Sequence, residues 1–93
     1  MSWVSTKEVF DQIAKGAAVT NVYQDESGKQ YKTISAKGVM TKQAIELLTS
    51  YYKNEGWAYV SVQNGQDYCA ASPECWRIYL GHCPMPDELV QVM

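Results

Sequence analysis

Three cysteines and the single histidine are the residues whose types could hold a metal ion or act as a nucleophile. They lie within one segment, as Cys69, Cys75, His82 and Cys83. Structural zinc sites bring their ligands in as close pairs, about two to four residues apart, whereas the gaps here are irregular. A nucleophilic thiol needs a histidine within hydrogen-bond reach, which the adjacent Cys83 rarely achieves. We therefore predict no metal site and no catalytic cysteine.

The odd number of thiols also bears on disulfide formation. At least one thiol stays unpaired if any disulfide forms, which suits a reducing compartment. We expect buried or half-buried free thiols. A disulfide between Cys69 and Cys75 is the alternative in an oxidising compartment.

Carboxylates are the remaining candidates for acid-base chemistry. The chain has ten Asp and Glu residues, which fall mostly at expected turns or on polar helix faces, where they stay solvated. The sequence contains no glycine-rich phosphate loop and no nucleophile elbow. We therefore predict that the chain is not an enzyme and uses no cofactor.

The aromatic residues are the feature that favours a binding function, because the chain has seven Tyr, three Trp and one Phe. Tyr, Trp and Arg are enriched at binding hot spots, because they supply a large contact area with a polar end. Two segments, residues 57–63 and 75–80, are expected to be neighbouring β-strands of a sheet that carries helices on one face. Side chains alternate between the two faces of a strand, so one group of them points to the face opposite the helices. This predicted binding surface consists of Trp57, Tyr59, Ser61, Arg77 and Tyr79.

Three other uses of this face stay open. The C-terminal residues Leu89, Val90 and Val92 would bury it by folding over it, or the face would form a homodimer contact. A nucleotide-like small ligand would stack on the aromatic rings while Arg77 pairs with its phosphate or carboxylate.

Local patterns predict two helices to support these residues. Ser5 and Glu8 form a capping box, Val4 and Val9 stand at the positions of a hydrophobic staple, and the helix extends over about residues 6–15. A second helix over residues 42–54 follows the N-cap residue Thr41.

Four segments read as β-strands. Residues 18–23 and 31–35 are rich in β-branched and aromatic residues and predict a hairpin. Residues 57–63 and 75–80 predict the third and fourth strands. A two-residue turn at Asn64-Gly65 would place a carboxylate on the buried face, so we expect a longer connection over residues 66–74.

These elements predict one α+β domain over residues 1–93, with the order α-β-β-α-β-β. The expected architecture is a two-layer sandwich, in which an antiparallel four-stranded sheet carries two helices on one face. Alternation places the following residues toward the helices: Val60, Val62, Trp76, Ile78 and Leu80.

Composition limits the function. The formal net charge is -2, with eight Lys and Arg against ten Asp and Glu. This disfavours general nucleic-acid binding, because contact with the phosphate backbone usually requires an excess of Lys and Arg. No secretory signal or transmembrane run is visible, so we expect a cytoplasmic protein without membrane contact. Our hypothesis is a stand-alone protein-binding module, such as a stoichiometric inhibitor, an immunity protein or a phage-encoded counter-defence protein of the anti-CRISPR type. The alternative is the small-ligand binder.

Overall fold

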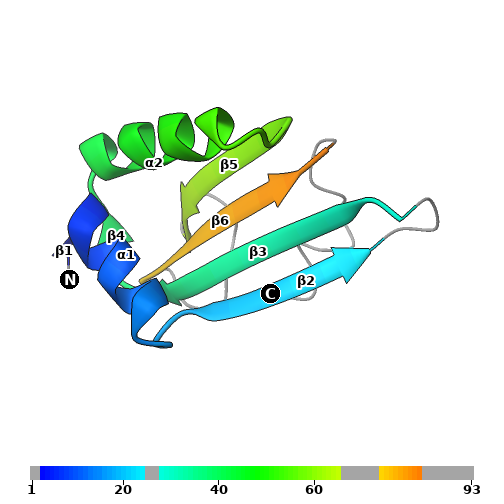
Figure 1. Cartoon of the computed structure of the whole chain (residues 1–93). Coiled ribbons are helices and arrows are strands. Elements are labelled where there is room, and N and C mark those ends of the chain that lie inside the picture. Colours follow the sequence, from blue (N-terminus) through cyan, green and yellow to red (C-terminus); the bar gives the residue numbers. More distant parts are fainter. Residues whose placement is uncertain (1–2, 25–27, 66–73, 83–93) are drawn as a thin grey trace.

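The computed structural model describes residues 3–24, 28–65 and 74–82 and has the predicted α+β architecture (Figure 1). A four-stranded antiparallel sheet has the strand order β2-β3-β6-β5, and two helices accompany it. The elements are β1 (Trp3–Val4), α1 (Thr6–Ala14), β2 (Val19–Gln24), β3 (Gln30–Lys37), β4 (Val39–Met40), α2 (Lys42–Asn54), β5 (Tyr59–Asn64) and β6 (Cys75–Gly81).

Both helices begin where their capping residues predict. The Ser5 hydroxyl accepts a hydrogen bond from the Glu8 amide at 3.4 Å, and the Thr41 hydroxyl accepts one from the Ala44 amide at 3.1 Å. Val4 and Val9 are both buried, as a hydrophobic staple requires. Helix α1 ends before Gly16, whose φ of 76° is readily available only to a residue without a side chain. The two helix predictions are confirmed.

The predicted hairpin and strand alternation are also confirmed. Strands β2 and β3 pair in register from Val19 opposite Ser35 to Gln24 opposite Gln30. The helix-facing residues of β5 and β6 belong to one hydrophobic core with residues of both helices. Its most deeply buried members are Val9, Leu48, Trp76 and Ile78.

The connection between β5 and β6 is long, as expected. Asn64 pairs with Trp76, so Asn64-Gly65 does not form a two-residue hairpin turn. Residues 66–73 of this connection lie outside the described residues. Strand β5 begins at Tyr59, two residues later than predicted.

A second, two-stranded sheet was not predicted. Strands β1 and β4 pair in parallel, with Trp3 opposite Val39 and Val4 opposite Met40. The side chain of Asn64 links this sheet to β5. Its Oδ1 accepts from the Met40 amide at 2.8 Å, and its Nδ2 donates to the Met40 carbonyl at 3.1 Å.

No helix within the described ranges is long and apolar enough to cross a membrane.

Candidate binding surface

The predicted binding surface is only partly exposed. Tyr59 has 46% of its surface exposed, and Ser61 is half-buried. Arg77 and Tyr79 are buried, with 3% and 1% exposed. The expectation that these five residues form one exposed aromatic face is therefore wrong.

Arg77 and Tyr79 are buried although alternation does turn them away from the helices. Their neighbours along β6, Trp76 and Ile78, are the ones that enter the helix-side core. The Tyr79 ring stacks on Tyr31 of β3, with the ring centroids 6.4 Å apart. The Arg77 Nη2 atom donates to Gln63 Oε1 at 3.2 Å. Alternation fixes the direction of a side chain but not its exposure, which depends on what packs beside it.

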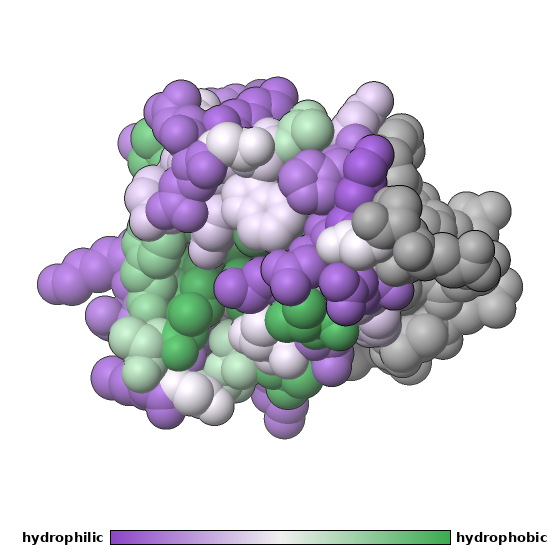
Figure 2. All heavy atoms as spheres, turned by 45° about the vertical axis from the view of Figure 1, so that its right-hand side comes forward, coloured by the Kyte–Doolittle hydropathy of each residue, from purple (hydrophilic) through white to green (hydrophobic). Residues whose placement is uncertain are grey.

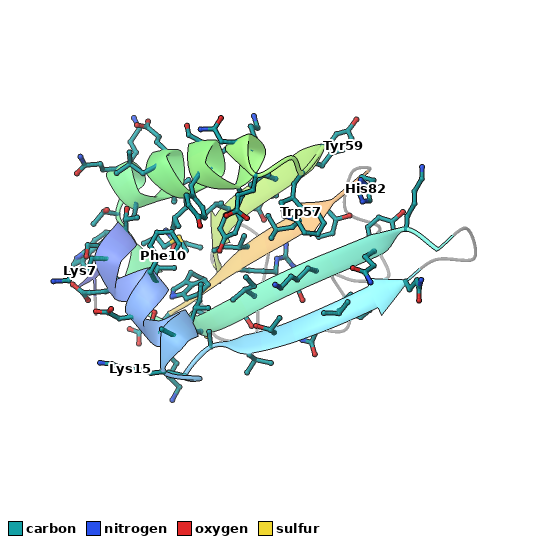
Figure 3. The ribbon with its side chains drawn as sticks, viewed as in Figure 1. Lys7, Phe10, Lys15, Trp57, Tyr59 and His82 are labelled. Atoms are coloured by element: carbon teal, nitrogen blue, oxygen red, sulfur yellow. The ribbon has the colours of Figure 1, made fainter. Side chains whose placement is uncertain are left out.

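Trp57 lies elsewhere, because it precedes β5 and is not bound by the alternation of that strand. Its side chain packs against the helix-side core. The Trp57 and His82 ring centroids are 5.8 Å apart. Figure 3 shows these two rings together near the end of β6, whereas Tyr59 points outward from β5. Trp57 and Tyr59 therefore do not share a surface.

A different group of apolar side chains, one half-buried and two exposed, lies where α1 meets α2. Phe10 of α1 contacts Tyr51 of α2 edge to face, with ring centroids 5.1 Å apart. Figure 3 shows Phe10 on the side of α1 that faces α2. Leu47 is one helical turn before Tyr51, so the two share a face of α2. Leu47 and Tyr51 are 50% and 44% exposed. We call Phe10, Leu47 and Tyr51 the helical patch.

Local packing orients Tyr51 within this patch. Its ring also contacts the buried Tyr52 ring edge to face, with the centroids 5.0 Å apart. The Glu55 carboxylate raises the pKa of Tyr51, first by accepting a hydrogen bond from its hydroxyl and then by its negative charge. Burial raises the pKa of Tyr52, with smaller contributions from Tyr51 and Glu55. The Tyr51 ring therefore packs edge to face against both Phe10 and Tyr52 and is still 44% exposed.

Sequence reasoning missed the helical patch for an identifiable reason. Of the two adjacent tyrosines of α2, Tyr52 is 8% exposed and belongs to the core, whereas Tyr51 is 44% exposed. Leu47 lies outside the buried stripe of α2, which consists of Ala44, Leu48 and Tyr52. The i, i+4 spacing of Leu47 and Tyr51, beside that stripe, was the available signal.

A hollow beside α1 offers little to an aromatic ligand. It encloses about 230 Å³ and is lined by Val4, Glu8, Asp11, Gln12, Lys15 and Ala17. None of these is aromatic, and none belongs to the predicted binding surface. The small-ligand hypothesis, which depends on stacking and on Arg77, gains no support from this hollow.

The cysteine predictions are addressed only in part. Cys75 is a half-buried free thiol, whereas Cys69 and Cys83 lie outside the described residues, as do Leu89, Val90 and Val92. Within residues 3–24, 28–65 and 74–82, no three His, Cys, Asp or Glu side chains are grouped to hold a metal ion.

Comparison with known proteins finds no matching family model, no matching curated protein and no matching solved structure.

Proposed function

We propose that this chain is a small protein-binding module that acts by occupying its partner, in the manner of a stoichiometric inhibitor, immunity protein or counter-defence protein. The observation that carries the proposal is the helical patch. It presents Leu47 and Tyr51, about half exposed, next to Phe10. Apolar side chains that stay together on a soluble surface usually mark an interaction site.

The composition of the patch suits a protein partner better than a small ligand. Protein interfaces use broad surfaces with aromatic anchors, whereas small ligands bind in concave pockets with converging polar groups. Tyr51 offers a polar hydroxyl together with an apolar ring that already packs edge to face against Phe10 and Tyr52. An anchor that is ordered before binding loses less side-chain entropy on association.

A partner captured from source cells and identified by mass spectrometry provides the first test. Titration calorimetry with that partner then compares the wild type with Leu47→Asp and Tyr51→Ala. Each variant should weaken binding by more than about 1 kcal/mol if its residue is a hot spot. Circular dichroism verifies that each variant is folded.

Two variants serve as controls. Glu46→Ala changes an exposed residue of α2 outside the patch and should leave the affinity unchanged. Tyr59→Ala tests the exposed tyrosine of the predicted binding surface. If only Tyr59→Ala weakens binding, the sheet face and not the helical patch is the contact surface, and the proposal is wrong.

A further inference from the structure

The two edges of the main sheet differ in how they are protected. At one edge, β5 lies beside α2, and its last residue, Asn64, is tied to Met40 of β4. At the other edge, β2 has β3 as its only partner among the described strands. Within residues 3–24, 28–65 and 74–82, no strand pairs with the outer row of N–H and C=O groups on β2, which is the row that a further strand would use.

Natural edge strands often carry charged residues, prolines or bulges that prevent such pairing, and β2 itself has none of these three. Its six residues, Val19–Gln24, include no charged residue and no proline. Their pairing with β3 is one to one throughout, so no bulge twists the edge away. Strand β2 is thus a regular, uncharged edge that favours strand addition.

Exposed valines add an apolar component to this edge. Val19 and Val22 are 60% and 61% exposed, the most exposed valines in the described part of the chain. Val22 pairs with Lys32, which pairs with Leu80, so Val22 lies on the helix-facing side of the sheet. Figure 2 shows apolar side chains in the lower half of the molecule, which holds β2 and β3 in Figure 1.

We propose that β2 pairs in antiparallel fashion with β2 of a second copy of this chain, which joins two four-stranded sheets into one of eight strands. A two-fold axis at Val22 places the two Val22 side chains directly opposite each other. It also places Asn21 opposite Tyr23 of the second copy, and Thr20 opposite Gln24. Every one of these pairs is uncharged.

The absence of charge is the reason that a second copy fits. A charged residue on the two-fold axis would face the like charge of its own copy, which destabilises a cross-strand pair. The uncharged strand meets its own copy without that cost, and the contact is isologous, so it closes at two subunits. This edge is separate from the helical patch, and the inference does not rest on the proposed function.

Sedimentation velocity over a wide range of protein concentration tests the proposal. The wild type should pass from monomer to dimer as its concentration rises. Val22→Lys sets two ammonium groups opposite each other and should raise the dissociation constant by roughly tenfold or more. Val19→Lys is the matched control. It is equally exposed on the same strand but lies beyond the paired residues, so it should leave the dimer intact.

Hydrogen exchange of the wild type gives a readout that needs no variant. Amides of residues 20–24 should exchange more slowly in the dimer than in the monomer. A wild type that stays monomeric, or a folded Val22→Lys variant that dimerises as tightly as the wild type, would overturn the proposal. The dimer and the proposed function can fail independently, because Leu47→Asp should weaken partner binding and leave the dimer unchanged.

Discussion

Gly81 shows how one residue determines the packing of the sheet face opposite the helices. A Cβ atom at this position would overlap the Tyr79 hydroxyl and would lie 2.7 Å from Tyr79 Cζ and 2.9 Å from Tyr31 Cδ1. The Tyr79 ring therefore occupies the space that a side chain at position 81 would need. Gly81 is used here for close approach and not for a left-handed backbone.

We expect Gly81→Ala to lower the free energy of unfolding by about 1 to 3 kcal/mol, because the two tyrosine rings must move. Urea denaturation measures this loss. In a Tyr79→Leu background the same substitution should cost less, since the closest contact is gone. Equal costs in both backgrounds would show that the two residues do not compete for space.

At the scale of elements, Asn64 joins the end of β5 to β4. Its amide satisfies both backbone groups of Met40, which is 1% exposed. Asn64→Ala leaves a buried N–H and a buried C=O without this partner and should lower the free energy of unfolding by at least about 2 kcal/mol. Chemical denaturation of the variant tests this.

Asn54→Ala is the control for Asn64→Ala, because Asn54 is exposed at the end of α2. This substitution should change the free energy of unfolding by no more than about 0.5 kcal/mol. Similar small losses for both variants would mean that water replaces the Asn64 amide at Met40.

Helices and long strands could be predicted because their signals are local. Each capping residue, Ser5 or Thr41, lies three positions before the amide that it caps. The core residues of α2 recur every four positions, as Ala44, Leu48 and Tyr52. Strands β1 and β4 have two residues each, too few to show a period, and they pair across 36 positions. The exposure of Arg77 and Tyr79 depends on contacts between elements that are distant in the sequence. The alternation of side chains along a single strand cannot predict such contacts.

The free energy of unfolding of the whole molecule should decrease at alkaline pH because of two tyrosines of α2. The folded protein raises the pKa of Tyr51 and of Tyr52 above the ordinary value of 10.0. Above pH 10.0 the unfolded chain therefore loses these protons first. The stabilising contribution is complete below that pH, and it declines as pH rises through the folded-state pKa values.

Urea denaturation at neutral pH and at increasing alkaline pH measures this decline. Tyr52→Phe removes one of the titrating hydroxyls and should make the alkaline loss smaller. If Tyr52→Phe leaves the alkaline loss of stability unchanged, other titrating groups must cause that loss.

The strand order β2-β3-β6-β5 also has a consequence for how the chain folds. Strand β6, the last described strand in the sequence, lies between two strands that are synthesised earlier. Until residues 75–81 leave the ribosome, β3 and β5 have no common neighbour, and the N-terminal hairpin cannot join the rest of the sheet. Sheet closure is therefore a late, non-local step, and such steps slow folding because a long loop must close first.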